Sequence, residues 1–433
     1  MKIINVGDRK FQNFFRKLRQ RGGAFNPALL SMVARIMKEV AANGDEALFK
    51  YTAKFDKYKL NAATLEVTPE EKKEALAKVN SQDLEILKLA AARIEKYHRH
   101  QTVQNWKLKD EEGIELGQRI LPLQRVGVYA PGGKACYPST LLMAAIPARL
   151  AGVKEIILVS PVKDGKLNPL IIAAAELGGV QRIFKIGGAQ AVAALAYGTK
   201  TIPQVDKIVG PGNAYVAAAK KSVFGQVGID MIAGPSEILI IADKTANASF
   251  VAADMLSQAE HDEMAAAVLL TPSEKLAREV AGEFDKQLKS LSRKKIIKSS
   301  LNNYGAIIIT KDLNQAVELT NDFAPEHLEL MVENPTEILK QVQNAGSVFL
   351  GSYTPEVLGD YLAGTNHILP TSGTARFSSP LGVYDFVKRM SVSSFTPAAL
   401  ARLGQQIAHF AQMEGLDAHA HSVSIRFKDS EKK

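Results

Sequence analysis

The stretch Val126–Ser160, VGVYAPGGKACYPSTLLMAAIPARLAGVKEIILVS, decides the fold class. Its two ends, Val126–Ala130 and Glu155–Ser160, are short runs rich in β-branched and apolar residues, which is typical of buried strands. Between them a turn of glycine and proline leads into Ser139–Ala151, an alanine- and leucine-rich segment of helical character. Because strand, turn, helix and strand follow one another, the stretch predicts a right-handed βαβ unit around a parallel sheet.

The alternation of strands and helices continues well beyond this stretch. We expect further strands at Arg182–Ile186 and Lys207–Val209, separated by alanine-rich helices. A second series begins with the strand Ile238–Ala242 and ends with Ser347–Leu350. Two successive series of this kind predict two doubly wound α/β domains, although no clean residue-level repeat relates them.

The N-terminal flank differs in its composition and in the spacing of its apolar residues. Residues 1–125 are charge-rich, and apolar residues recur at spacings of three and four in Leu29–Val40 and in Leu84–Ile94, which predicts amphipathic helices. A short strand pair is expected at Thr64–Val67 and Ile114–Ile120.

The C-terminal flank begins with a long irregular segment. Residues 351–379 are rich in glycine, threonine, serine and proline, and a loop of this length inside a compact domain is usually functional. The tail predicts one helix at Pro397–Met413 and a last strand at Ser422–Phe427. This tail is too small for a domain of its own, and such an arm often packs on a partner subunit.

Composition narrows the class of protein. The chain has 433 residues, of which 46% are hydrophobic and 23% charged, as in ordinary globular proteins. Its net charge of +9 is spread along the chain, which favours an anionic small ligand or cofactor over nucleic acid. The single cysteine, Cys136, excludes an intramolecular disulfide and an all-cysteine metal site. No apolar run has the length of a bilayer span, and we expect a cytoplasmic protein with no membrane partner.

Three glycine-rich turns follow predicted strands. Gly127–Lys134 resembles a phosphate loop but lacks the Walker spacing, and no G-x-G-x-x-G follows any predicted strand. Alone it is either a generic anion site at a helix N-terminus or a tight turn that binds nothing. Gly187–Gln190 and Gly210–Asn213 occupy equivalent places, where doubly wound sheets bind ligands. Together the turns predict a nucleotide or dinucleotide site, beside which lie Tyr129, Gln190 and Asn213.

Nitrogen and oxygen ligands for a metal ion are present in the second half of the chain. Gln258 and His261 are three residues apart on one predicted helix and therefore share a face. Asp360 and His419 would complete a set of two nitrogens and two oxygens, a plausible zinc shell. The residues alone do not select this quartet, because His367, His421 and Glu414 are also available.

An adjacent carboxylate and imidazole, Glu326 and His327, suit general acid–base chemistry near neutral pH. Two other residues are weaker candidates. Ser236 could contact a ligand but lacks the G-x-S-x-G setting of a nucleophile. Cys136 lies at a helix start, where a thiolate would be stabilised, but a packing role is preferred for it.

Five long motifs resemble one enzyme family. They are GPGNAYVAAAK from Gly210, IDMIAGPSEILIIAD from Ile229, LSQAEHD from Leu256, APEHLEL from Ala324 and LGDYLAGTNHILPTSGTARFSSPL from Leu358. Together with the segments around them, they are similar to the histidinol dehydrogenases over residues 125–426. That family oxidises L-histidinol to L-histidine through the aldehyde, with two NAD and one zinc ion per subunit.

The resemblance implies a role for each candidate residue. Gln258, His261, Asp360 and His419 would bind zinc, the last from the other subunit of a homodimer with shared active sites. Glu326 and His327 would transfer protons, and the NAD site would be lined by Tyr129, Gln190 and Asn213. The substrate would meet the zinc shell and four further residues, namely Ser236, His327, His367 and Glu414.

The resemblance also implies a domain plan, with two incomplete Rossmann-like domains and small dimerisation arms at both termini. We expect an N-terminal helical arm at 1–24 and a discontinuous zinc and substrate domain at 25–127 and 237–380. Residues 128–236 would form the domain with the NAD-lining turns. A C-terminal arm at 381–433 would cross the dimer.

Two other functions compete with this interpretation. A zinc hydrolase could use Glu326 or Glu263 as the base for a metal-bound water, but it would leave the three glycine-rich turns without a role. A non-catalytic nucleotide- or RNA-binding protein could use the +9 charge, and its binding would depend strongly on salt.

Overall fold

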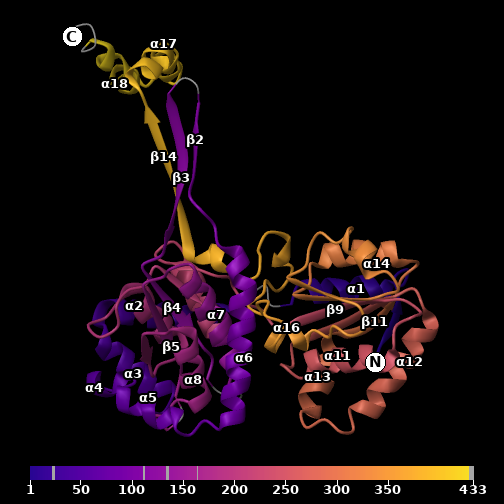
Figure 1. The fold of residues 1–433 in the computed structure, drawn as a ribbon. Helices are drawn as coiled ribbons and strands as arrows, with labels where there is room; N and C mark the ends of the chain where they lie inside the picture. The colour runs from indigo at the N-terminus through magenta and orange to yellow at the C-terminus, as the bar shows by residue number, and fades with distance from the viewer. Residues whose placement is uncertain (22–24, 111–112, 133–135, 163, 429–433) are drawn as a thin grey trace. The chain divides into compact units, whose positions relative to one another are not determined.

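A computed structural model describes residues 1–21, 25–110, 113–132, 136–162 and 164–428 of the chain. They form two compact units (Figure 1). The first unit comprises Met1–Thr102 and Leu123–Phe386, and the second comprises Val103–Pro122 and Val387–Lys433.

The first unit contains a five-stranded parallel sheet in the order β6–β5–β4–β7–β8. Its strands are β4 (Arg125–Tyr129), β5 (Glu155–Val159), β6 (Arg182–Phe184), β7 (Lys207–Val209) and β8 (Gly228–Ile229). The crossover helices are α7 (Pro138–Leu150), α8 (Pro169–Gly178), α9 (Gly188–Tyr197) and α10 (Ala214–Val223). Neighbouring residues of one strand enter different cores, as Ile156 and Ile157 of β5 do, so the sheet is covered on both faces (Figure 1).

The first unit also contains a six-stranded parallel sheet in the order β1–β11–β10–β9–β12–β13. Its strands are β1 (Ile3–Asn5), β9 (Glu237–Ala242), β10 (Ala266–Thr271), β11 (Gly305–Ile309), β12 (His327–Met331) and β13 (Ser347–Leu350). The larger helices that belong to it are α1 (Arg9–Arg19), α11 (Ala248–Ala259), α12 (Glu274–Gln287), α13 (Lys294–Tyr304) and α14 (Leu313–Phe323). Two parallel, doubly wound sheets confirm the predicted α/β fold class.

The N-terminal third divides between the two sheets, which differs from the predicted ranges. The helices of residues 27–101 are α2 (Pro27–Asn43), α3 (Asp45–Phe55), α4 (Ala62–Leu65), α5 (Pro69–Leu76), α6 (Ser81–His98) and the 3₁₀ turn η1 (Arg99–Gln101). Their buried side chains, such as Val33 and Ile94, lie in the cores of the five-stranded sheet, and one of these cores also contains Ile368 of the irregular segment. In contrast, β1 pairs with β11, and α1 buries Phe11 and Leu18 against the six-stranded sheet. Described residues 1–21 are therefore part of the first unit in this chain.

The expected strand pair is only half correct. Ile114–Ile120 lies within β3 (Ile114–Pro122), but residues 64–67 form no strand. Instead, β3 pairs with β2 (Trp106–Lys109) and β14 (Val387–Phe395). Thr64 and Leu65 end helix α4, and Glu66 makes only an isolated bridge to Phe184. The capping box between Asn61 and Thr64 explains the helical start, because it satisfies backbone N–H groups that a strand would have to pair elsewhere.

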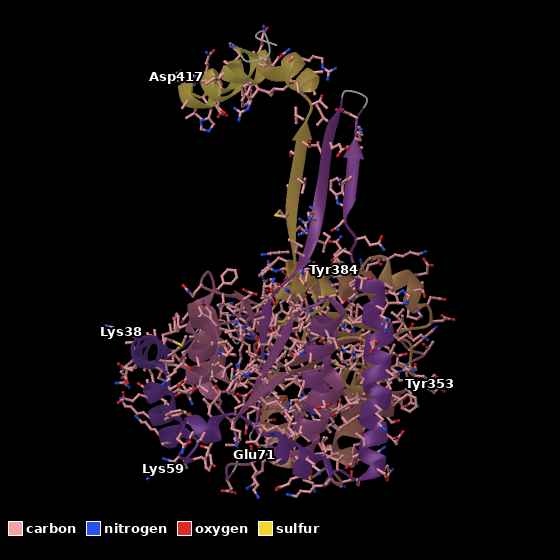
Figure 2. All side chains as sticks on the ribbon, turned by 60° about the vertical axis from the view of Figure 1, so that its left-hand side comes forward. Lys38, Lys59, Glu71, Tyr353, Tyr384 and Asp417 are labelled. Carbon is pink, nitrogen blue, oxygen red and sulfur yellow. The ribbon has the colours of Figure 1, made fainter. Side chains whose placement is uncertain are left out.

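The second unit is a three-stranded antiparallel sheet followed by two helices. The strands β2 (Trp106–Lys109), β3 (Ile114–Pro122) and β14 (Val387–Phe395) lie in the order β14–β3–β2. The helices are α17 (Pro397–Met413) and α18 (Asp417–Lys428), which Asp417 begins (Figure 2). The predicted strand Ser422–Phe427 is therefore wrong. Its alternating pattern suits a strand, but in the helix Phe427 packs against Gly404 of α17, and this tertiary contact decides the conformation.

The long irregular segment of residues 351–379 is mostly without regular structure, as predicted. It contains only the short helix α16 (Val357–Tyr361) and the 3₁₀ turn η2 (Thr374–Arg376). The remaining short helices of the chain are α15 (Pro335–Leu339) and η3 (Val383–Phe386). None of the helices in the described part of the chain combines the length and apolar character that crossing a bilayer demands.

The predicted site residues lie at the carboxyl ends of the strands in one sheet and at the amino ends of the strands in the other. In the five-stranded sheet the chain order reverses between β4 and β7. Two of the three glycine-rich turns follow the carboxyl ends of these strands and the third follows β6, at the edge where ligands bind in doubly wound folds. In the six-stranded sheet the reversal lies between β9 and β12, but Ser236 and the pair Glu326 and His327 lie at their amino ends. The rule that ligands bind at the carboxyl ends of the strands therefore fits the predicted residues of the five-stranded sheet but not those of the six-stranded sheet.

Gly210, at the carboxyl edge of the five-stranded sheet, allows a test of the tight packing there. Gly210 has a φ of +103°, and a Cβ there would lie 2.2 Å from the carbonyl oxygen of Tyr129. Gly225 has a φ of +102°, but nothing lies within 4 Å of its Cβ position. We expect Gly225→Ala to lower the free energy of unfolding by about 1–2 kcal/mol, the cost of the left-handed backbone. Gly210→Ala should cost clearly more in urea denaturation, and equal losses would contradict the close contact.

Candidate active site

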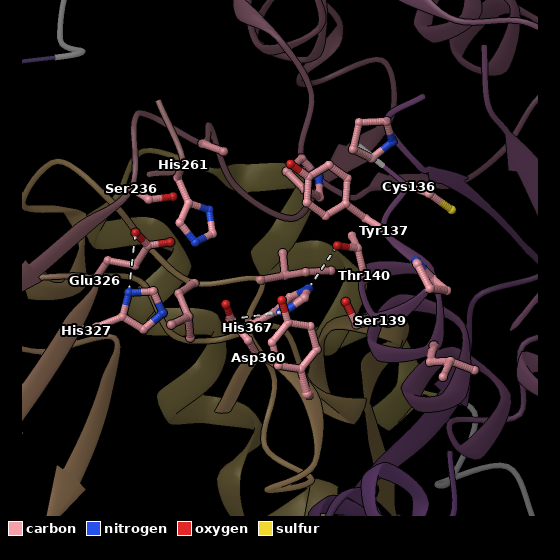
Figure 3. A pocket seen from close by; sticks show the side chains of 18 of the residues that line it. Cys136, Tyr137, Ser139, Thr140, Ser236, His261, Glu326, His327, Asp360 and His367 are labelled. Atoms are coloured by element: carbon pink, nitrogen blue, oxygen red, sulfur yellow. Dashed lines mark hydrogen bonds and ion pairs between the residues drawn. The ribbon is translucent and has the colours of Figure 1, made fainter. Parts of the chain in front are cut away.

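A pocket of about 770 Å³ in the first unit collects most of the predicted site residues. Figure 3 shows polar side chains of its lining, which come from α7, α16, the loop after α11, the irregular segment and the amino ends of β9 and β12. The predicted residues among its lining are Ser236, Gln258, His261, Glu326, His327, Asp360 and His367. Predicted residues that are up to 131 positions apart in the chain thus share one cavity, since they run from Ser236 to His367.

The register of two strands brings the acid–base pair together with a third residue. In the parallel pair β9–β12, His327 lies opposite Ile238, so Glu326 and Glu237 are neighbours at the same edge. The backbone N–H of Glu237 donates a hydrogen bond of 2.9 Å to Oε2 of Glu326. Its carbonyl oxygen is 3.1 Å from Nδ1 of His327. The backbone of one residue, Glu237, therefore contacts both members of the pair.

The carbonyl contact determines the form of His327. A carbonyl oxygen can only accept a hydrogen bond, so Nδ1 must carry the proton, and Nε2 of the neutral ring is then a base. Burial lowers the pKa of His327 to about 4, although the negative charge of Asp360 opposes this shift. His327 is thus neutral at physiological pH and able to accept a proton.

Burial shifts the pKa of Glu326 in the opposite direction. It raises the pKa of the Glu326 carboxyl well above its ordinary value, and the nearby carboxylate of Glu237 adds to the effect. The Glu326 and His327 side chains are 3.7 Å apart between Oε2 and Nδ1, too far for a hydrogen bond (Figure 3). A carboxyl with a raised pKa beside a neutral imidazole is a pair prepared for proton transfer.

A group of possible metal ligands lies in the same region. Ligand atoms of His261, Glu356 and Asp360 all lie within 4.8 Å of one another. Gln258 is fully buried on α11, one helical turn before His261, and lines the same pocket. One imidazole nitrogen with carboxylate and amide oxygens is a donor set that suits zinc or a similar ion.

His367 is held between two polar partners. Its Nδ1 is 3.3 Å from Oδ1 of Asp360, and its Nε2 is 2.9 Å from Oγ1 of Thr140 on α7. The His367 ring thus links a helix of the five-stranded sheet to the carboxylate of the metal-ligand group (Figure 3).

The three residues predicted for the NAD site lie at the carboxyl edge of the five-stranded sheet. Tyr129 ends β4, and its hydroxyl accepts a hydrogen bond of 3.1 Å from the N–H of Gly188. Gln190 is buried in α9, and its Nε2 has no hydrogen-bond partner among the described residues. Asn213 caps α10 by accepting from the N–H groups of residues 215 and 216. None of the three lines the 770 Å³ pocket, which the neighbouring residues Pro131, Pro211 and Gly212 reach instead.

Two predicted site residues belong to the second unit. Glu414 follows α17, and His419 is in the first turn of α18. Both are exposed and line a hollow of about 640 Å³ between these helices. They are thus brought together with each other inside their own unit.

Cys136 and the first glycine turn add little to the site. Burial raises the pKa of the Cys136 thiol, which is the opposite of what a nucleophilic thiolate requires. Gly133 and Lys134 of the turn lie outside the described residues.

Four residues of the site were missed by sequence reasoning: Arg21, Thr140, Glu237 and Glu356. Glu237 carried a usable signal, because a charged residue that begins the apolar run ILIIA must be buried and needs a partner. Thr140 and Glu356 carried none, since their relation to the site arises only from folding.

The fold and the pocket together point to an α/β enzyme with a buried carboxyl and imidazole beside a possible metal site. Comparison with known proteins gives the family. The histidinol dehydrogenase family model matches residues 19–427. The chain therefore belongs to the histidinol dehydrogenase family and is an oxidoreductase.

Relatives of this family match nearly the whole chain. The histidinol dehydrogenase of Syntrophotalea carbinolica is 53% identical over 430 residues, which is 99% of this chain and 100% of that protein. That of Geobacter sulfurreducens is 52% identical over 429 residues, with 99% and 100% covered. The crystal structure of histidinol dehydrogenase from Elizabethkingia anophelis has a TM-score of 0.93 at 39% identity and covers 100% of this chain and 99% of that one. Family membership decides against the hydrolase and the nucleic-acid-binding alternatives.

The contact between His327 and Glu237 leads to a spectroscopic prediction. In the metal-free chain we expect His327 to stay neutral, with its proton on Nδ1, from pH 8 down to about pH 5, because its pKa is lowered to about 4. Imidazole ¹⁵N chemical shifts of histidine-labelled protein report both properties, and His327→Gln identifies the signals. A midpoint above about pH 6, or a proton on Nε2, would contradict the tautomer assignment.

Proposed function

We propose that this enzyme oxidises L-histidinol to L-histidine in two steps, with L-histidinaldehyde as intermediate and two NAD⁺ as hydride acceptors. The observation that supports this function best is the pair Glu326 and His327 in one pocket with the ligand atoms of His261 and Asp360. The overall reaction consumes one water and yields two NADH and three protons, so the protein must handle several proton transfers in one place.

The residues of the pocket fit a zinc ion. Gln258, His261 and Asp360 would hold it in this chain, and His419 of the partner subunit would complete a set of two nitrogens and two oxygens. The close grouping of the ligand atoms of His261 and Asp360 supports this. When bound, zinc would fix the substrate through its imidazole and amine nitrogens and polarise the reacting oxygen.

His327 is proposed as the base of the first oxidation. It accepts the proton of the alcohol at Nε2 while the hydride leaves the adjacent carbon for NAD⁺. Its Nδ1–H remains bound to the carbonyl oxygen of Glu237, which keeps the ring oriented and favours the imidazolium that forms. The product of this step is the aldehyde.

Glu326 is proposed as the base of the second oxidation. It takes a proton from the water that adds to the aldehyde, and the resulting hydrate loses the second hydride to give the carboxylate. The raised pKa of Glu326 makes its ionised form a stronger base than an ordinary carboxylate, although less of it is ionised near neutral pH. Ser236, His367 and Glu414 are proposed as substrate contacts.

The NAD site is proposed at the carboxyl edge of β4 and β7, where the chain order of the five-stranded sheet reverses. Tyr129, Gln190 and Asn213 would line it. The buried Nε2 of Gln190 supports this, because a donor without a partner among the described residues is available to a ligand. Pro131 and Gly212 lie both at this edge and in the 770 Å³ pocket, which would bring the nicotinamide to the substrate.

We further propose a homodimer with shared active sites in the cytoplasm. The second unit supports the dimer, because exposed apolar side chains such as Phe410 and Met413 accompany Glu414 and His419 on its helices. The single cysteine is compatible with a reducing compartment.

The reaction predicts a fixed stoichiometry. Zinc-loaded protein should form two NADH per L-histidinol, measured by absorbance, because the aldehyde is oxidised before release. Activity should be lost on treatment with a chelator and return with zinc. One NADH per histidinol would contradict the second oxidation, and full activity after verified metal removal would contradict the metal site.

The shared site predicts complementation between two inactive variants. His261→Asn and His419→Asn each remove one proposed zinc ligand and should each be inactive. After subunit exchange, a mixed dimer has one site with both defects and one with none, so about half of the mixed dimers' sites should work. No activity in mixed dimers verified by mass spectrometry would show that the site is not shared. His100→Asn, an exposed position, is the control and should stay active.

A further inference from the structure

Two side chains that no proposed chemical step uses lie directly behind the acid–base pair. The backbone N–H and C=O of Glu237 contact Glu326 and His327, as described above. The position of the Glu237 backbone therefore decides where both proposed catalytic groups point. What holds this backbone in place is the side chain of the same residue.

The Glu237 carboxylate is anchored from two directions. Its Oε2 accepts a hydrogen bond of 2.7 Å from Nη2 of Arg21, and its Oε1 accepts one of 2.7 Å from the N–H of Ser372. The Arg21 and Glu237 side chains are 0% and 1% exposed. A charge pair this completely removed from water is costly to desolvate and must keep its geometry to offset that cost.

Arg21 also anchors the residues that precede the strand. The same Nη2 atom donates to the carbonyl oxygen of Pro235 at 3.1 Å, so one nitrogen contacts both sides of Ser236. The guanidinium lies 5.6 Å from the ring centroid of Tyr304. Arg21 closely follows α1, whose buried phenylalanines are packed on the six-stranded sheet, and this fixes the origin of the side chain.

We propose that Arg21 and Glu237 are positioning residues, which hold the 235–237 segment so that its backbone orients Glu326 and His327 for proton transfer. The proposal deepens the proposed function and rests on it for its kinetic consequence. The N-terminal segment thereby acts on the reaction through one buried ion pair. It does not itself contact the reacting atoms.

The expected effect falls mainly on the chemical steps. Neither side chain belongs to the proposed zinc or substrate contacts, so a displaced 235–237 segment should lower kcat through Glu326 and His327. Any rise in KM should be smaller and come from Ser236, the one proposed substrate contact in the segment. A misplacement of the order of 1 Å can cost about 100-fold in rate, and we expect a loss of about 10- to 100-fold for Arg21→Met.

A matched set of variants tests this in the full-length, zinc-loaded enzyme. Arg21→Met removes the charge and the donor, whereas Arg21→Lys keeps both and can serve both acceptors, because they share one nitrogen in the native structure. Arg19→Met is the control, since Arg19 makes an ion pair with Asp322 that is about half exposed. We expect Arg21→Met to lose kcat, Arg21→Lys to recover most of it, and Arg19→Met to behave like the unchanged enzyme.

A second measurement does not depend on turnover. The imidazole ¹⁵N signals of His327 should change in Arg21→Met and stay near their native values in Arg21→Lys. If Arg21→Met does not fold, the double variant Arg21→Met/Glu237→Gln, which leaves no buried charge, replaces it and should show the same loss of kcat and the same altered signals.

The outcomes separate the two proposals. An unchanged enzyme that forms no NADH from histidinol would overturn the proposed function, while the His327 signals would still decide the positioning role. Native kcat and native His327 signals in Arg21→Met or in the double variant would overturn the positioning role. A loss in Arg19→Met as large as in Arg21→Met would also overturn it, because the effect would then not come from the buried pair.

Discussion

The parallel pairing of β9 with β12 is the interaction on which the site depends. Its register sets Glu237 beside Glu326, so that the backbone of one residue can bind a carboxylate through its N–H and an imidazole through its C=O. A shift by one residue would direct the side chains of the strand to the other face. The hydrophobic cores on both faces of the six-stranded sheet prevent such a shift, and they therefore help to fix the geometry of the site.

Burial then gives these groups their chemical character. The same low-polarity surroundings raise the pKa of Glu326 and lower that of His327, because each shift favours the neutral form. An exposed pair of the same residues would be a carboxylate beside a partly charged imidazole. A bound cation would oppose the shift of the carboxyl, which makes the resting state and the loaded state of the pocket electrostatically different.

The sequence was sufficient for the α/β class and for most strands and helices, because apolar runs and glycine turns are local signals. It failed at Ser422–Phe427, where contact with Gly404 outweighs the strand pattern. It also failed to show which sheet residues 27–101 pack against, because that depends on tertiary contacts. Motifs located Glu326, His327, His261 and Asp360, and the structure brings these into one pocket. Arg21 could not be found in this way, since its role depends on a contact with a residue 216 positions away.

The pairing of β1 with β11 also has a consequence for synthesis of the chain on the ribosome. The first helix carries four apolar side chains whose partners lie beyond residue 237, so more than half of the protein must be made before this face can be covered. Until then the apolar face of this amphipathic helix is exposed on the emerging chain, and exposed apolar surface favours association with other chains. The basic residues interspersed along this helix give the uncovered segment a positive charge, which repels other copies of it. The five-stranded sheet can fold during this time.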